Sequence, residues 1–172
     1  FLVKNEIDYF KNTIQYLHYV FESGNKKNIG VVLSHIKKSK LTMDQEYLLM
    51  AKKVFIYRTL KKRRELQRDL SAFKKMIISR NKASVRTDSK AELIDEINSY
   101  TGYLQELLSS QRLLKKKTKR LYLKYVGVNF NILKYIDPVN ALKYNFYEGE
   151  TYFSFRNYMR ASYVYASGIR EH

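Results

Sequence analysis

The sequence lacks cysteine altogether, which excludes disulfide bonds, thiolate zinc sites, iron–sulfur clusters and a cysteine nucleophile. It has a single proline, Pro138, and only six glycines in 172 residues. Because few helix-breaking residues interrupt the chain, the sequence predicts long α-helices. No apolar run reaches the ~18–20 residues that a membrane-crossing helix needs. We therefore expect no transmembrane segment, and we favour a soluble intracellular protein of the cytoplasm or an organelle matrix.

Acidic residues are also scarce: 16 Asp and Glu stand against 33 Lys and Arg, for a formal net charge of +17. The hydrophobic fraction of 45% and the aromatic fraction of 15% favour a folded core over disorder. A net charge of this size destabilises a compact chain by self-repulsion, which a polyanionic partner would relieve. Nucleic acid is the commonest such partner. Anionic membrane and inositol-type or polymeric phosphates are the alternatives.

Catalytic and metal-binding motifs are missing from the sequence. It contains no glycine-rich phosphate loop, no H-E-x-x-H and no G-x-S-x-G pattern. The three histidines, His18, His35 and His172, show no spacing suited to a shared metal ion. We therefore expect a protein that is not an enzyme and that carries no metal and no cofactor.

Apolar residues recur at spacings of three and four over residues 5–22, which is typical of one face of an α-helix. Gly24 suits the C-terminal cap of this helix. A short second helix is expected from about residue 29 to residue 38, with Val32, Leu33 and Ile36 facing inward. Residues 1–40 are thus expected to form an N-terminal helical pair.

A long helical hairpin is expected over residues 42–127. Thr42 with Gln45 forms a capping-box pattern, and neither proline nor glycine occurs again before Gly102, so one helix is predicted from about 43 to 82. Ser89 and Glu92 form a second capping-box pattern, which predicts a helix from about 90 to 126. Both apolar stripes have near-heptad spacing, so the two helices are expected to pair as an antiparallel, coiled-coil-like hairpin.

Residues 128–172 are rich in Tyr and Phe and are expected to form a helical cap over the open end of the hairpin. Asp137 followed by Pro138 is a typical helix start. That helix should end near Gly149, and a last amphipathic element should cover about 151–166. The chain as a whole, 1–172, is expected to be a single all-α domain.

Two long windows of the sequence contain cations and no acid. Seven Lys and Arg lie between Glu46 and Glu65, and eight lie between Glu106 and Asp137. A hairpin turn near residue 85 would place Lys52 opposite Lys119, so that both windows form one basic surface. Ordinary helix surfaces mix signs through Glu–Lys pairs, and such pairs are mostly missing here. A solvated helix face remains the other interpretation.

The expected contacts with phosphates or another polyanion are Lys52, Lys53, Arg58, Lys61, Arg64, Arg112, Lys115, Lys116, Lys119, Arg120 and Lys124. Midway along the hairpin a polar layer, which includes Thr59, Arg63 and Ser109, interrupts both apolar stripes. It would set the register of the hairpin or admit a ligand.

Aromatic side chains of the C-terminal region are expected mainly in the core, with some left at an interface. Tyr152, Phe155 and Tyr158 are the candidate aromatic contacts, because such rings stack on unpaired bases. Arg156 and Arg160 nearby would reach phosphates.

The sequence therefore favours a basic, helical structural component of a ribonucleoprotein assembly such as a ribosome. Its expected partners are nucleic acid, RNA over DNA, and other proteins of the assembly. Phosphate contacts of this kind give affinity and position without reading sequence. One alternative is a protein–protein docking or adaptor subunit. Another is a peripheral module that binds anionic lipid, inositol phosphate or polyphosphate.

Overall fold

The structure is a computed structural model that describes residues 6–36, 41–80, 87–110 and 114–170. These residues form eight α-helices and one short 3-10 helix, with no strand among them, so the expected all-α class is confirmed. The helices are α1 (Glu6–Glu22), α2 (Lys26–Ile36), α3 (Met43–Thr59), α4 (Arg63–Ser79), α5 (Thr87–Ser110), α6 (Lys116–Ile136), η1 (Pro138–Asn140), α7 (Ala141–Ser154) and α8 (Tyr158–Arg170).

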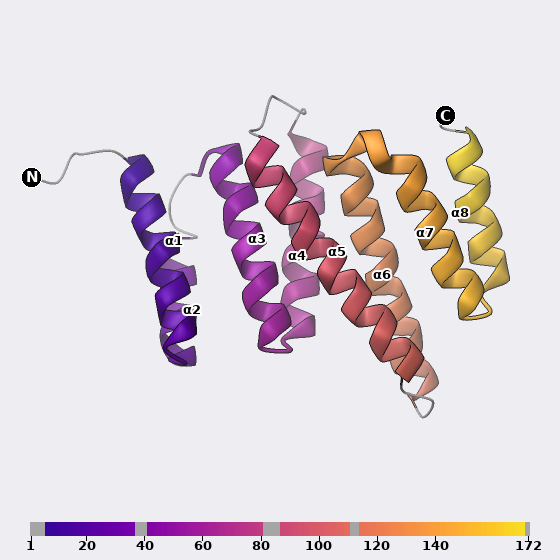
Figure 1. Cartoon of the computed structure of the whole chain (residues 1–172), viewed down its shortest axis with the longest axis horizontal. Helices are drawn as coiled ribbons and strands as arrows, with labels where there is room; N and C mark the ends of the chain where they lie inside the picture. The colour runs from indigo at the N-terminus through magenta and orange to yellow at the C-terminus, as the bar shows by residue number, and fades with distance from the viewer. Residues whose placement is uncertain (1–5, 37–40, 81–86, 111–113, 171–172) are drawn as a thin grey trace, which may run out of the picture.

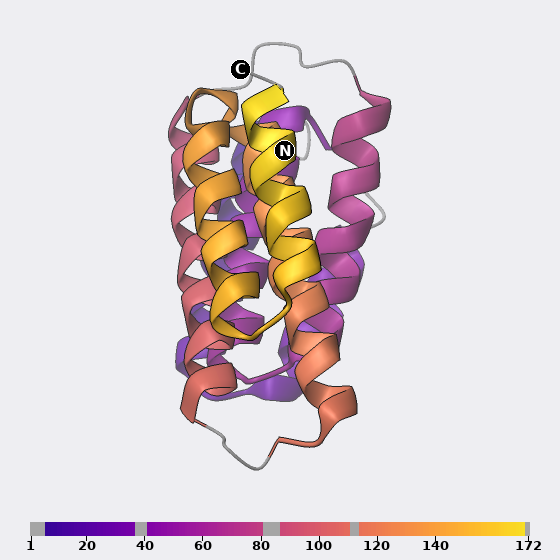
Figure 2. The same ribbon diagram turned by 90° about the vertical axis from the view of Figure 1, so that its right-hand side faces the viewer.

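The helices run alternately in opposite directions and follow one another along the long axis of the molecule (Figure 1). The pair α1–α2 lies at one end of this stack, and α8 lies at the other. In the middle, α3 packs against α5 and α4 packs against α6, which makes a four-helix unit. Helix α7 packs against α6, and α8 packs against α7, as the end-on view shows (Figure 2).

The expected long hairpin is not present, because each of its two helices is divided into two antiparallel helices. The helix predicted over 43–82 is α3 and α4, which are separated at residues 60–62, and the one predicted over 90–126 is replaced by α5 and α6. The polar layer that interrupts both apolar stripes marks these divisions: Thr59 ends α3 and Arg63 begins α4, and Ser109 lies next to the end of α5.

Helix α3 is apolar on two faces, which explains the shorter helices. Tyr47 and Val54 join the main core, formed with α4 to α8, whereas Leu49 and Ile56 join a second core with α1 and α2. In a simple two-helix hairpin, one of these faces would remain in water. Stacking of helical pairs buries both, and burial of apolar surface is the dominant favourable contribution to folding.

A chain of buried polar side chains crosses the main core. Gln67 of α4 donates from Nε2 to Asn129 Oδ1 of α6 (3.4 Å), and Asn129 Nδ2 donates to Thr101 Oγ1 of α5 (3.2 Å). All three residues are buried. Since buried amides need partners to offset their desolvation, this chain favours one relative placement of α4, α5 and α6.

The expected helix caps are partly confirmed. Thr42 and Gln45 form the reciprocal capping box, with Gln45 N to Thr42 Oγ1 at 3.3 Å and Thr42 N to Gln45 Oε1 at 2.8 Å. Pro138 begins η1, as its position after Asp137 predicts. The second capping box is wrong, because α5 begins at Thr87, before Ser89.

The C-terminal helices differ from the expected boundaries. Gly149 lies inside α7 and does not end it, and the last helix begins at Tyr158. A Cβ at Gly149 would lie 2.3 Å from the ring of Tyr165 on α8, so glycine permits the close approach of α7 and α8. By contrast, a Cβ at Gly102 would meet nothing within 4 Å.

Candidate nucleic-acid interface

Exposed cations gather at one end of the stack. The turns α1–α2, α3–α4 and α7–α8 and the start of α6 all lie at this end, the lower one in Figure 1. We call it the basic end and, leaving aside Lys26 and Lys27, which are exposed at the α1–α2 turn, define it by eleven exposed residues: Lys61, Lys62, Arg64, Lys115, Lys116, Lys117, Lys119, Arg120, Lys124, Arg156 and Arg160. None of them forms an ion pair with an acidic residue in the described part of the chain. Glu22, Glu65 and Glu106 lie at the same end.

Two of these cations occupy backbone conformations that disfavour them. Lys61 (φ 56°) and Arg156 (φ 58°) are left-handed, and they are the only non-glycine residues of the described chain with positive φ. Each ends a helix in a Schellman motif: Lys62 N donates to Tyr57 O (2.8 Å), and Asn157 N donates to Tyr152 O (2.9 Å). Glycine usually holds this position, as Gly24 (φ 74°) does after α1. At two of these three turns a basic residue therefore replaces glycine.

The predicted cations of α3 are paired with acids and do not face solvent as a free surface. Lys52 Nζ bonds Glu92 Oε1 on α5, and Arg58 Nη2 lies 3.2 Å from Glu96 Oε2 on the same helix. The expected position of Lys52 opposite Lys119 is wrong, because α3 lies beside α5. Burial raises the pKa of Glu96 above the usual carboxyl value, and Arg58 opposes that rise.

Lys53 is removed from the predicted contacts because it is buried. Only 6% of it is exposed, and its Nζ lies 2.5 Å from Asp69 Oδ2 of α4, which is buried as well. Such a pair holds α3 against α4, and it leaves no ammonium at the surface for a phosphate. Arg112 lies outside the described residues.

The remaining predicted cations are brought together by two different connections. Lys61 and Arg64 belong to the α3–α4 turn and the start of α4, and Lys115 precedes α6. Lys116, Lys119, Arg120 and Lys124 follow on the first half of α6. Their proximity at one end comes from the up-and-down order of the helices.

Arg63 is absent from the predicted set, and it has a structural role. Its guanidinium lies over the rings of Tyr103 of α5 (5.5 Å to the centroid) and Tyr122 of α6 (5.3 Å), and it donates to both hydroxyls. This contact ties α4 to α5 and α6 just above the basic end. The sequence pattern placed Arg63 in the polar layer, where setting the register was one of two expectations, but a cation held between two rings has no sequence signature of its own.

The three candidate aromatic contacts have different environments. Tyr152 is buried, with its hydroxyl 3.4 Å from Leu123 O, so it is a core residue. Phe155 is partly buried, with Lys119 Nζ over its ring at 5.6 Å. Tyr158 is 55% exposed and packs edge-on against Phe153. Phe155 and Tyr158 thus place aromatic surface beside Arg156 at the basic end.

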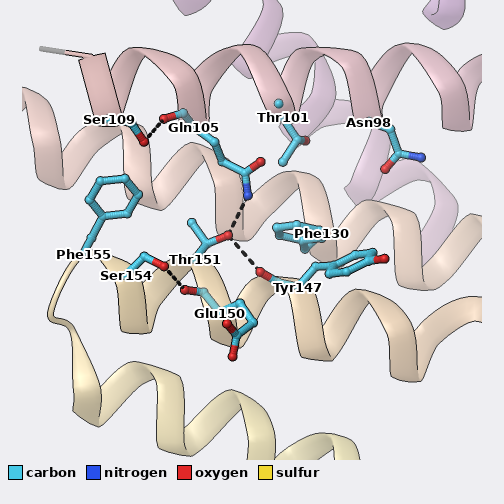
Figure 3. Close-up of a pocket in the computed structure, with 11 residues that line it drawn as sticks. Asn98, Thr101, Gln105, Ser109, Phe130, Tyr147, Glu150, Thr151, Ser154 and Phe155 are labelled. Atoms are coloured by element: carbon cyan, nitrogen blue, oxygen red, sulfur yellow. Dashed lines mark hydrogen bonds between the residues drawn. The ribbon is translucent and has the colours of Figure 1, made fainter.

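A cleft of about 470 Å³ between α5 and α7 is a different kind of site (Figure 3). Gln105 Nε2 donates to Thr151 Oγ1 (2.6 Å), and Thr151 Oγ1 donates to the carbonyl of Tyr147 (2.8 Å). Glu150 is the one carboxylate in its lining, and no Lys or Arg contributes. This cleft therefore lacks the charge to attract an anion.

Membrane-spanning and metal-binding features are missing from the described residues. Over the described ranges, no helix is both long enough and apolar enough to cross a bilayer. The same residues contain no group of three or more His, Asp or Glu that would hold a metal ion. No protein-family model, no curated protein and no solved structure matches this chain.

Proposed function

We propose that the protein binds nucleic-acid backbone, RNA in preference to DNA, as a structural component of a ribonucleoprotein assembly. One observation carries this proposal: eleven exposed cations that form no ion pair with an acid of the described chain lie at the basic end, on the α3–α4 turn, on α6 and on the α7–α8 turn. Like charges at such density repel one another, and a row of phosphates would replace that repulsion with attraction.

The choice of RNA rests on the aromatic residues at the same end. Phe155 and Tyr158 lie on either side of Arg156, with Tyr158 largely exposed. Aromatic rings stack on unpaired bases, and neighbouring cations bind the adjoining phosphates. Folded RNA presents unpaired bases far more often than duplex DNA does. A structural RNA partner would place the protein in the cytoplasm or an organelle matrix.

The test is a binding titration with labelled single-stranded RNA, double-stranded RNA and double-stranded DNA at several KCl concentrations. For backbone binding, log K should fall with log[KCl] by roughly 0.7–0.9 for each phosphate neutralised. The fourfold variant Lys61→Glu, Arg64→Glu, Lys116→Glu and Arg120→Glu should abolish binding while its helical circular dichroism stays unchanged. A matched control, Lys11→Glu with Lys75→Glu, reverses charge away from the basic end and should retain nearly the wild-type affinity.

Three results would contradict the proposal. If RNA does not bind at about 100 mM KCl, backbone contacts of useful strength are excluded. An equal loss in the control variant would show that total charge, and not the basic end, governs binding. Competition by inositol hexakisphosphate or anionic vesicles, with no competition by RNA, would favour the lipid or polyphosphate alternative.

Docking to another protein is the second candidate, favoured by a separate observation. The outward face of α7–α8, at the end of the stack, exposes Leu142, Phe146, Phe153 and the 78%-exposed Ile169 around a shallow apolar groove. Terminal helices of stacked folds usually carry a polar outer face. If the face docks protein, the Phe146→Ser and Phe153→Ser variant should lose self-association or partner binding in sedimentation measurements, with RNA affinity unchanged.

A further inference from the structure

The structure assigns a phosphate-ester site to a pocket between α6 and α8. The pocket has a volume of about 360 Å³, and its three cations, Arg120, Lys124 and Arg160, belong to the basic end. Arg120, Lys124 and Asn131 line it from α6, Arg160 lines it from the first turn of α8, and Asn157 lies just before that helix. Tyr152 of α7 completes the lining, and none of the lining residues is a carboxylate.

The three cations are arranged in a way that an anion would stabilise. Arg120 and Lys124 are one turn apart on α6, where like charges repel. Arg160 reaches the same pocket from α8, and no acidic side chain of the described chain forms an ion pair with any of the three. A phosphate group carries the charge and the acceptor oxygens to bind all three at once.

Arg160 is held in place before any ligand arrives. Its guanidinium lies over the ring of Tyr163 (5.1 Å to the centroid) and over the ring of Tyr152 (5.8 Å). A guanidinium positioned on aromatic faces still presents its N–H edge for a bidentate contact with phosphate. Because its side chain is already ordered, binding costs less conformational entropy than it would for a free surface arginine.

The base of the pocket depends on a close contact between α6 and α7. Gly127 of α6 approaches Tyr152 so closely that an added Cβ would lie 2.4 Å from the Tyr152 hydroxyl. The carboxylate of Glu148 lies beneath, 1% exposed, with Oε2 2.9 Å from Lys134 Nζ. Since Lys134 neutralises Glu148, the three cations above remain the uncompensated charge of this region.

The room in the pocket indicates more than a bare phosphate. Ligand pockets start at about 300 Å³, whereas inorganic phosphate occupies far less. Leu123 and Val128 add apolar surface beside the cations. A phosphate ester with an attached ribose suits this lining. If the proposed function holds, the phosphate ester that binds here belongs to an RNA strand that continues across the basic end. A free mononucleotide carries the same phosphate and ribose and is the other source of this ligand.

Calorimetric titration of the full chain at 100 mM KCl tests the site with adenosine 5′-monophosphate, inorganic phosphate, adenosine and a short single-stranded RNA. We expect the monophosphate to bind and adenosine not to bind. Arg160→Gln and Lys124→Gln should each weaken the monophosphate about ten- to hundredfold, as loss of one charged hydrogen bond predicts. The matched control Lys75→Gln removes a charge from α4 and should bind as wild type does.

Arg160 packs on two tyrosines, so Arg160→Gln could weaken binding by changing the local packing. Lys124 is exposed, so Lys124→Gln tests the loss of charge without that effect. Equal affinity of the monophosphate for wild type and Lys124→Gln would overturn the site, and so would equal binding of adenosine. Loss of monophosphate binding with intact RNA binding in Arg160→Gln would support a mononucleotide as the ligand. Monophosphate binding without RNA binding would support the site while ending the proposed function.

Discussion

Replacing Lys61 by glycine should stabilise the protein and weaken its binding to nucleic acid at the same time. Lys61 is the left-handed residue that ends α3 (φ 56°), and it belongs to the basic end. A left-handed conformation costs a side-chain-bearing residue roughly 1–2 kcal/mol. Glycine removes this cost but loses about 0.5–1 kcal/mol of backbone entropy on folding. We therefore expect Lys61→Gly to raise the free energy of unfolding by about 0.5–1 kcal/mol.

The assay is urea unfolding followed by circular dichroism, with a thermal scan beside it. The midpoint should rise at constant m-value, and Tm should rise by about 1–4 °C for a chain of this size. In RNA titrations the same variant should lower the slope of log K against log[KCl] by about 0.7–0.9, because one phosphate contact is lost.

Lys61→Ala is the matched control. It removes the same charge but keeps a Cβ, so it should weaken binding like the glycine variant without any gain in stability. If the alanine variant is as stable as the glycine variant, the strain argument fails. If neither variant changes RNA affinity, the charge at this turn has no part in binding. Arg156→Gly and Arg156→Ala repeat the comparison at the end of α7, where φ is 58°.

Three other predictions follow from buried and close-packed side chains. Lys53→Met should cost about 3–5 kcal/mol because the buried Asp69 then keeps only the longer contact to the exposed Arg68 (3.6 Å). Adding Asp69→Leu should recover most of that loss in a double-mutant cycle, and simple additivity of the two losses would contradict this expectation. Gly149→Ala should lower the free energy of unfolding by about 1–3 kcal/mol because the new methyl group overlaps the ring of Tyr165. An unchanged free energy of unfolding in urea denaturation would show that the ring moves aside at no cost. The hydrogen bond to Glu150 raises the pKa of Tyr165 to about 12; its stabilising contribution should be present below pH 10 and lost as pH rises towards 12, and an absorbance titration should lose this late tyrosine transition in Tyr165→Phe.

Local signals in the sequence predicted the helices near their caps and failed at the turns. Thr42 with Gln45 and Gly24 after α1 are side chains whose chemistry matches their position, and both predictions agree with the structure. Lys61 and Arg156 occupy positions where glycine would be expected, so the sequence contains no glycine that would predict the end of α3 or of α7 there. At both positions a basic residue with a left-handed backbone forms the turn, and the sequence there predicts that the helix continues.

At the candidate site, the sequence also did not predict which side chains pair between neighbouring helices. An acid-free window shows only that no acid lies nearby in the sequence. In the fold, Lys52 pairs with Glu92 and Arg58 pairs with Glu96, each about forty residues away along the chain. Those partners depend on α3 lying beside α5, which the expected hairpin did not contain. On α6, Lys134 likewise pairs with Glu148 (2.9 Å), whereas Lys116, Lys119, Arg120 and Lys124 form no ion pair with an acid of the described chain.

The separate core under α1 and α2 has a consequence for how the molecule opens. Within the described part of the chain, the core under α1 and α2 is completed only by residues 41–60, among them Leu49 and Ile56. Unfolding of this pair would expose that face of α3 and leave the other core, with the basic end on α4, α6 and α8, in place. Native-state hydrogen exchange should therefore show α1 and α2 opening together at a lower free energy than α5 and α6. The protein could then bind a polyanion at the basic end while α1 and α2 are unfolded.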